Sequence, residues 1–356
     1  MYQNTTTYAL LKAHFQRYPL LQPQDVLKFL HQSAFGCGHL IASPTAAAEY
    51  IGQEVAECAE SIAAIEDLDG DFCRLHLSYT KKLGVSADTL AKLLAQSAQE
   101  PCGAGESLET QLTIALSMAK NGELPFSFEE LNQEIIPWRN AGFPARHHSE
   151  AFRDAYAPAY RVIKKEYAQW LPFLAKIEAE SLKKSPALIA IEGGSASGKT
   201  TLSQLLSRVY DCNVFHMDDF FLRPEQRTEA RFAQAGGNID HERFLAEVLL
   251  PLSKGEVVQY RAFDCSTFTL RPAVEIDPKG LNIIEGAYSM HPQLAQYYDF
   301  SVFLSVTPQL QRKRIEKRNS PDMAQRFFDT WIPLERTYFE ETDAAARCSM
   351  IWEVKE

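Results

Sequence analysis

Several features are missing from this 356-residue sequence, and each absence excludes a class of protein. Positive charge is not in excess, since 36 lysines and arginines stand against 46 aspartates and glutamates, for a formal net charge of −10. Nucleic acids and anionic membranes attract basic faces, so neither is an expected partner. No run of 18 apolar residues occurs, and the first residues lack a basic stretch followed by an apolar one. We therefore expect neither membrane spanning nor secretion.

Cysteine pairs with metal-site spacing are also missing. The seven cysteines are scattered, and no two of them are spaced as Cys-x-x-Cys. This pattern favours neither a zinc ribbon nor a disulfide framework, and it is typical of a reducing cytoplasm. Hydrophobic residues make up 46% and charged residues 23%, an ordinary globular balance, and the length suffices for two domains.

The first 180 residues have the periodicity of a mainly α-helical domain. Apolar residues recur at steps of three and four, as in Leu10, Leu11, Phe15 and Tyr18. Further helices are predicted over residues 44–61, 87–99, 106–120, 127–136 and 148–179. The alternation between Asp71 and Tyr79 predicts one isolated strand.

The pattern changes after a polar linker, Ser181 to Pro186, which ends in proline. Short β-rich runs and helical segments alternate from there to the end of the second domain, 187–356. The predicted strands are 187–192, 212–216, 257–263, 281–285 and 300–306, and the predicted helices are 198–209, 240–253 and 307–318. Such alternation predicts an α/β fold, with a parallel sheet covered by helices on both faces.

One motif in the second domain carries specific chemistry. Gly193 to Thr200 reads GGSASGKT and matches the P-loop pattern G-x-x-x-x-G-K-[ST], between a buried strand and a helix. Backbone N–H groups of such a loop, with the helix N-terminus, cradle a triphosphate. The sequence therefore predicts a P-loop NTPase that binds ATP and Mg²⁺. The expected nucleotide contacts are Gly193, Gly194, Ser195, Ala196, Ser197, Gly198, Lys199, Thr200 and Thr201.

Three side chains are predicted to handle the phosphate and the metal ion. Lys199 would bridge the β- and γ-phosphates, and the Thr200 hydroxyl would bind Mg²⁺. Asp218 follows a short strand about one βα unit after the P-loop, where an acid could accept a proton from the acceptor hydroxyl or hold the metal through water. Glu285 ends the run Leu281 to Ile284, a place that suits a second acid near Mg²⁺.

These motifs together resemble a known family. GGSASGKTT, the acid in MDDFF, NIDHERF, the Phe-Asp pair in RAFDCST, and IIEG before an arginine-rich helix stand in the order found in uridine kinases. Uridine kinases belong to the wider uridine kinase and phosphoribulokinase group of P-loop kinases. The resemblance covers roughly residues 187–320.

The resemblance implies a role for several positions. Asp218 would be the catalytic base and a metal-sphere acid, with Glu285 and Thr200 beside it. Asp240, followed by His241, would grip sugar hydroxyls, and Phe263-Asp264 would match a Tyr-Asp pair whose ring packs on the nucleobase. The chain has Phe263 in place of that tyrosine, and it lacks the histidine that follows the pair in uridine kinases.

The resemblance also assigns a role to the basic helix after residue 307. Arg314 and Arg318 are four residues apart and so share a helix face, where the kinase group places arginines that neutralise charge in the transition state. The segment 319–341 would be a lid that closes over the site, and Arg326 is its first arginine to test.

The N-terminal domain, 1–180, offers less specific signals. Gly36, Cys37, Gly38 and His39 form an unusual cluster that could be a metal site, a ligand-binding loop or a packing junction between helices. The aromatic residues between Phe152 and Trp170 are typical of a core, and Pro158 among them predicts a kink in the helix or its division in two. Regulation, substrate capture and oligomerisation all fit this domain, so a homo-oligomer stays open.

The leading hypothesis is ATP-dependent phosphoryl transfer to a hydroxyl of a small metabolite, with a nucleoside as the first acceptor to consider. A second hypothesis is a nucleotide-dependent switch, in which ATP binding controls the helical domain. A third keeps the kinase fold and changes the acceptor to pantothenate, a sugar phosphate or a cofactor precursor.

Overall fold

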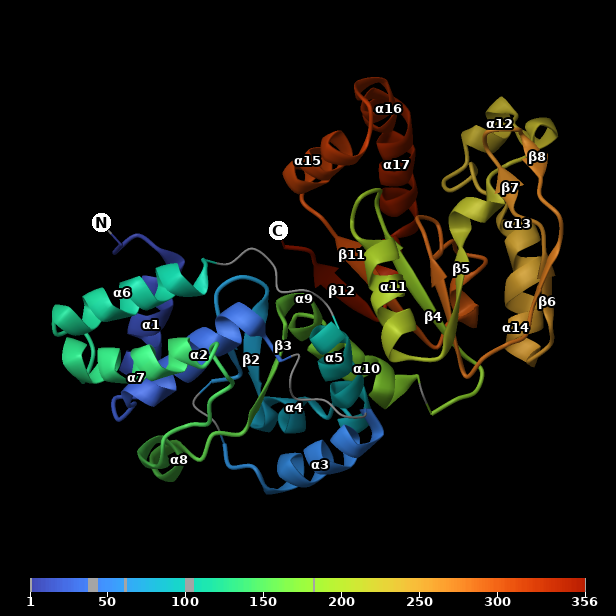
Figure 1. The fold of residues 1–356 in the computed structure, drawn as a ribbon. Helices are drawn as coiled ribbons and strands as arrows, with labels where there is room; N and C mark the ends of the chain where they lie inside the picture. Colours follow the sequence, from blue (N-terminus) through green and yellow to red (C-terminus); the bar gives the residue numbers. More distant parts are fainter. Residues whose placement is uncertain (1, 38–43, 61–62, 100–105, 182, 356) are drawn as a thin grey trace. The chain divides into compact units, whose positions relative to one another are not determined.

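The structure of the chain is a computed structural model that describes residues 2–37, 44–60, 63–99, 106–181 and 183–355. The chain forms two compact units, Met1–Ala175 and Lys176–Glu356 (Figure 1). No helix within the described ranges has both the length and the apolar character needed to cross a membrane.

The first unit is mainly helical. Several of its helices begin at side-chain caps: the hydroxyls of Thr5, Ser107 and Ser127 accept hydrogen bonds from backbone N–H groups of the first turn of α1, α6 and α7. The helices are α1 (Thr6–Arg17), α2 (Pro23–Phe35), α3 (Pro44–Glu57), α4 (Leu77–Leu83), α5 (Ala87–Gln99), α6 (Leu108–Lys120), α7 (Phe128–Asn140), α8 (Glu150–Tyr156) and α9 (Lys165–Ala168). A further helix, α10 (Leu171–Glu180), contains the division between the two units.

A small antiparallel sheet completes the first unit and corrects one prediction. The strand predicted at residues 71–79 is present as β2 (Phe72–His76), but it is not isolated, because it pairs with β1 (Ile65–Asp67) and β3 (Tyr160–Lys164). The helix predicted over 148–179 is split near Pro158, and β3 takes the place of its middle part. Its first part, α8, is short. It ends at Tyr156, where Ala157 has a φ of 39° and Pro158 lacks the N–H that a helix would need.

The end of α2 needs a glycine at Gly36, for a reason of backbone conformation and of space. Its φ is 60°, and a Cβ atom placed on it would lie 2.6 Å from Cζ of Phe72. The neighbouring Cys37 is fully buried. These contacts fit a packing junction between α2 and the sheet, while Gly38 and His39 of the same cluster lie outside the described residues.

The second unit is built on a five-stranded sheet in which every pairing is parallel. Its order is β12-β11-β4-β10-β5, with β4 in the centre. The strands are β4 (Ala187–Gly193), β5 (Cys212–His216), β10 (Leu281–Glu285), β11 (Phe300–Ser305) and β12 (Met350–Glu353). The predicted α/β fold with a parallel sheet is confirmed.

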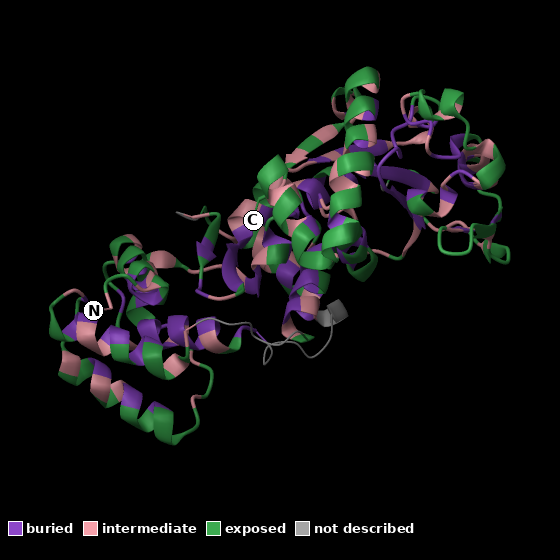
Figure 2. Ribbon diagram, turned by 90° about the horizontal axis from the view of Figure 1, so that it is seen from above, coloured by how far each residue is buried: buried purple, intermediate pink, exposed green. Residues whose placement is uncertain are grey.

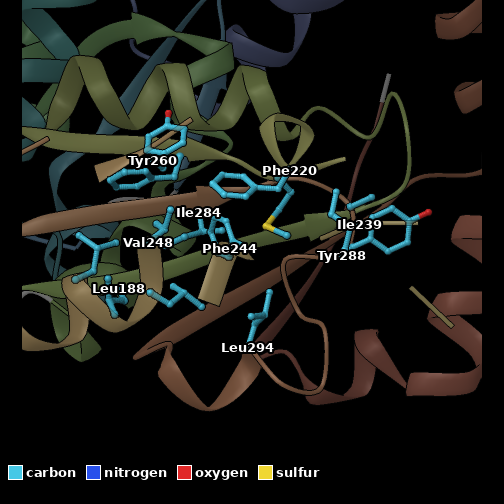
Figure 3. Close-up of a cluster of buried hydrophobic side chains, with 14 of the residues drawn as sticks. Leu188, Phe220, Ile239, Phe244, Val248, Tyr260, Ile284, Tyr288 and Leu294 are labelled. Carbon is cyan, nitrogen blue, oxygen red and sulfur yellow. The ribbon is translucent and has the colours of Figure 1, made fainter. Parts of the chain in front are cut away.

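Helices cover both faces of this sheet, because its central strands are buried. Every residue of β4 and β10 is buried, so both faces are covered (Figure 2). Helix α11 (Lys199–Val209) contacts β4, β5 and β10. An apolar cluster, which includes Leu188, Phe244 and Ile284, brings side chains of the sheet against the segment 241–260 (Figure 3).

One further prediction for the second unit needs correction, and one helix is confirmed with a π-helical turn in its middle. The strand predicted at 257–263 does not join the parallel sheet; its first part, β6 (Val258–Tyr260), pairs with β9 (Val274–Ile276), and β7 (Phe263–Asp264) pairs with β8 (Thr269–Leu270). The helix predicted over 240–253 is present as α13 (His241–Phe244), a π-helical turn (Leu245–Leu249) and α14 (Leu250–Lys254). The edge strand β12 was not predicted at all.

The segment predicted as a lid is helical throughout most of its length. It follows α15 (Pro308–Arg318) and consists of α16 (Pro321–Arg326), a π-helical turn (Phe327–Trp331) and α17 (Ile332–Thr342), followed by the short α18 (Ala344–Arg347). Thr307 and Ser320 cap α15 and α16, and a proline follows each cap.

Candidate nucleotide and phosphoryl-transfer site

The P-loop joins the end of β4 to the start of α11, in the centre of the sheet. Gly193 has a φ of 148° and Gly198 a φ of 101°, conformations that L side chains rarely adopt. A Cβ atom on Gly193 would also lie 2.8 Å from the Leu304 carbonyl oxygen. The glycines of the motif are therefore required by the backbone path of the loop and by its close contact with β11.

Lys199 lies over its own loop. Its Nζ donates to the carbonyl oxygens of Gly193 (2.8 Å) and Gly194 (3.0 Å). These bonds hold the ammonium group above the helix N-terminus, where phosphate oxygens would be additional acceptors.

Two of the three oxygen ligands predicted for a metal ion, Thr200 and Glu285, meet at the adjacent strand. Glu285 ends β10, which pairs directly with β4, and its Oε1 accepts from the Thr200 hydroxyl at 3.2 Å. His216, which was not predicted, places Nδ1 2.6 Å from the same oxygen. This hydrogen bond to Glu285 raises the pKa of the His216 imidazole.

Asp218 belongs to the same group of charges. It lies in a 3₁₀ turn (Met217–Phe220) directly after β5, the other neighbour of β10. Its side chain reaches solvent, yet the surrounding protein displaces enough water to raise its pKa. Lys199 opposes this rise and Glu285 adds to it, so all three side chains act on one another electrostatically.

The donor set suits Mg²⁺, which prefers oxygen ligands and usually keeps phosphate and water in its shell. Thr200, Glu285 and Asp218 offer a hydroxyl and two carboxylates. No group of three or more His, Cys, Asp or Glu side chains among the described residues could hold a metal ion by itself. The residues present therefore fit a metal ion that arrives with the nucleotide.

The acids predicted for the acceptor site already have protein partners. Asp240 is buried, caps α13 through the Arg243 N–H, and accepts from Nε2 of Gln226 at 2.9 Å. Asp264 accepts from the backbone N–H and hydroxyl of Ser266 and from Arg271. These bonds lower the pKa of Asp264 to about 2, with the hydroxyl of Ser266 the largest cause.

The rings predicted beside the acceptor are likewise packed within the protein. The ring of His241 stacks on that of His291 at 3.8 Å between centroids. Phe263 is buried, with the Arg227 guanidinium 5.6 Å from its ring centre. Strand β7, which carries Phe263, contacts the 3₁₀ turn of Asp218.

Of the two predicted arginines on α15, Arg314 contacts the P-loop. Its Nη1 donates to the Ala196 carbonyl at 3.2 Å, and its Nη2 donates to the Lys355 carbonyl. Arg318 instead packs its guanidinium on the ring of Phe327. The four-residue spacing did not bring the two guanidinium groups to one target.

A cavity of about 770 Å³ opens at the C-terminal ends of β11 and β12, beside the residues that Arg314 bridges. Its volume is within the range of small-molecule sites. It was not predicted, because it is formed by distant segments. Its lining residues are Ser305, Val306, Thr307, Pro308, Gln309, Leu310, Lys313, Glu353, Val354 and Lys355.

Glu192 is a second residue that the motif analysis missed, although it stands directly before the P-loop. It is fully buried, and its carboxylate accepts from the N–H groups of Gly193 (2.8 Å) and Met290 (2.9 Å) and from the Tyr338 hydroxyl (3.0 Å). Burial raises its pKa to about 7 despite these donors. The signal available in the sequence was an acid at the end of an apolar strand.

Comparison with known proteins places the similarity in the second unit. Residues 188–332 match the model of the Phosphoribulokinase / Uridine kinase family. The uridine kinase of Brevibacillus brevis is 26% identical over 152 residues, which is 40% of this chain and 69% of that protein. The uridine kinase of Chloroflexus aggregans is 29% identical over 150 residues, which is 40% of this chain and 70% of that protein.

Among solved structures, a possible uridine kinase from Bacillus stearothermophilus aligns with a TM-score of 0.42 and 22% identity, over 52% of this chain and 99% of that one. The family match and the sequence relatives support a P-loop kinase, a phosphotransferase. The resemblance that the ordered motifs predicted is confirmed to this extent: residues 188–332 match the model of that family.

Proposed function

We propose that the second unit transfers the γ-phosphoryl group of ATP to a hydroxyl of a small metabolite. The observation that carries the proposal is the contact between Thr200 and Glu285, with Lys199 and Asp218 in the same group of charges. A P-loop that only bound nucleotide would not need an acid such as Asp218 in the turn after β5, the strand beside β10.

In the proposed reaction the acceptor oxygen attacks the γ-phosphorus of ATP, and the bond from that phosphorus to the β,γ-bridging oxygen breaks. Asp218 accepts the proton of the acceptor hydroxyl, for which its raised pKa is favourable. Lys199 and the loop N–H groups bind the phosphates, and Mg²⁺ held by Thr200 and the two acids would neutralise phosphate charge.

A nucleoside is the first acceptor class to test, because the sequence relatives of this chain are called uridine kinases. Asp240, His241, Phe263 and Asp264 would then line the acceptor site. Pantothenate and sugar phosphates are the next classes. As a kinase of small metabolites the protein would act in the cytoplasm, and the segment 319–341 would close over the bound nucleotide.

The test is an acceptor screen. Purified protein is incubated with ATP, Mg²⁺ and a panel of nucleosides, sugars, sugar phosphates and vitamins, and ADP is measured against a reaction without acceptor. One acceptor should raise ADP formation well above the water background, and the Asp218→Asn variant should not. If every acceptor leaves the rate at background while ATP still binds, the kinase proposal fails, and the nucleotide-dependent switch is then tested by an ATP-dependent conformational change.

A further inference from the structure

An acid of helix α17 is bound to the phosphate-binding loop. Glu335 is 6% exposed and accepts two hydrogen bonds from one residue of the P-loop. The Ser195 N–H donates to Oε2 at 2.9 Å, and the Ser195 hydroxyl donates to Oε1 at 2.6 Å. Both carboxylate oxygens are therefore used on a single loop residue.

Two side chains of α15 hold the same part of the loop. Nε2 of Gln311 donates to the Ser195 carbonyl at 2.8 Å, and Arg314 donates to the Ala196 carbonyl. The Ser195 N–H, hydroxyl and carbonyl are thus all bound by side chains that lie outside the loop. A Cβ atom on Gly194 would lie 3.1 Å from Nε2 of Gln311 and 3.4 Å from Oε2 of Glu335, so both side chains pack closely against that glycine.

A second contact ties α17 to the strand before the loop. Tyr338, three residues after Glu335 and fully buried, donates to the carboxylate of Glu192 at 3.0 Å. Residues three apart share one helix face. One face of α17 therefore binds both the end of β4 and the first half of the P-loop.

The charge of Glu335 makes this arrangement costly for a nucleotide-binding loop. Burial raises the pKa of Glu335 and the charge of Asp218 adds to that rise, while the positive charge of Lys199 and the two Ser195 donors oppose it. A carboxylate beside the phosphate site also repels phosphate. The cost is offset if the carboxylate holds the loop in its binding shape before the nucleotide arrives, because preorganisation lowers the entropy lost on binding.

We propose that Glu335 is a positioning residue of the nucleotide site and acts through Ser195. Its carboxylate fixes the first half of the P-loop, and it couples that shape to the position of α17. This inference rests on the proposed binding of ATP by the loop, but it concerns the geometry of the loop and is independent of the acceptor.

Three variants test it: Glu335→Ala, Glu335→Gln, and Glu340→Ala as a matched control, an exposed acid on the same helix. We expect Glu335→Ala to weaken ATP binding about tenfold in equilibrium titration. Glu335→Gln should stay within about twofold of the wild type, since the amide oxygen can accept from the Ser195 N–H and the amide nitrogen can donate to the hydroxyl. Glu340→Ala should bind as the wild type does.

The alternatives give different results. If both Glu335 variants bind ATP more tightly than the wild type, the carboxylate is a charge barrier and the proposal is overturned. Equal affinity of Glu335→Ala and Glu340→Ala would overturn it as well. A purely structural role would lower Tm for Glu335→Ala and leave the affinity of the folded protein unchanged.

A measurement without nucleotide separates this proposal from the proposed function. Hydrogen exchange of the amides in Ser195 to Ser197 should become about tenfold faster in Glu335→Ala and stay unchanged in Glu340→Ala. If the wild type binds no ATP, the proposed function fails, while this exchange difference still decides whether Glu335 fixes the loop.

Discussion

The hydroxyl oxygen of Thr200 lies 3.2 Å from Oε1 of Glu285, although 85 residues separate them in sequence. The contact exists because β4 and β10 are neighbours in the sheet and end at the same edge. Two oxygen ligands predicted separately thus face each other beside Lys199, at the point where a metal ion bound to nucleotide phosphates would lie.

We expect Thr200→Val, which keeps the shape of the side chain and removes the hydroxyl, to lose most of the Mg²⁺ dependence of ATP binding. Loss of one oxygen ligand leaves the ion held by fewer protein groups. Titration of ATP with Mg²⁺ should show about a tenfold weaker affinity than the wild type, while titration in EDTA should show the two proteins alike. An equal loss under both conditions would mean that the hydroxyl does not act through the metal.

Asp218→Asn should bind ATP with an affinity close to that of the wild type and lose turnover by about 10²- to 10⁴-fold, the usual range for removal of a general base. The matched control is Asp219→Asn, which changes the neighbouring acid in the same way. The Asp219 carboxylate accepts from the Tyr260 hydroxyl at 3.4 Å. Steady-state ADP release with the acceptor found in the screen measures both. Turnover within tenfold of the wild type in Asp218→Asn would exclude it as the base.

Acid should destabilise the first unit through His148. Nδ1 of His148 lies 2.9 Å from Oδ1 of Asp25, and its Nε2 lies 2.6 Å from the Tyr160 hydroxyl. Burial lowers the pKa of His148 to about 4, and the hydrogen bond to Asp25 opposes that shift. An unfolded histidine titrates near 6.5, so between about pH 6.5 and 4 the unfolded chain binds a proton that the folded unit does not. Stability should therefore fall as the pH falls through this window.

The measurement is urea unfolding at pH 6.5 and pH 4.5. Between these two values, His148→Gln should lose about 1 to 2 kcal/mol less free energy of unfolding than the wild type, because one group no longer titrates. Buried His14, whose pKa is lowered mainly by burial to about 3, leaves a dependence of the same sign in both proteins. An identical pH dependence in wild type and variant would contradict the prediction.

Gly36→Ala should destabilise the first unit by about 2 to 4 kcal/mol, since the added methyl group would overlap the Phe72 ring and the backbone has a positive φ. Gly84→Ala is the control, with a φ of 79° and open space around the position, and should cost only about 1 kcal/mol. The two free energies of unfolding are compared by urea titration. Similar values would show that α2 and the sheet can move apart at Gly36.

The apolar periodicity and the positions of the glycines predicted the central part of the second unit well. The strand predicted at 281–285 matches β10 residue for residue, and the helix predicted at 198–209 differs from α11 by one residue. In both cases the apolar period and the flanking glycines agree with the tertiary structure. The helix predicted at 148–179 is interrupted by β3, because the pairing of β3 with β2 outweighs the helical period of its aromatic residues.

The acceptor site could not be predicted to the same depth. Asp240 and Asp264 were assigned by resemblance, and the structure gives each of them protein partners that no spacing rule reveals. His216 and Glu335 carried no motif, since an isolated histidine or a helical glutamate has no distinctive neighbours. Their partners, Glu285 and Ser195, lie 69 and 140 residues away.

The sequence by itself determined the P-loop, because the backbone conformations of that turn depend on glycines at given positions and on the strand and helix beside it. It also determined the alternation of strands and helices, which follows from local periodicity. Only the tertiary structure decided the strand order, the meeting of Thr200 with Glu285, and the attachment of α17 to Ser195. Those contacts join distant segments, and their geometry follows from how the whole unit packs.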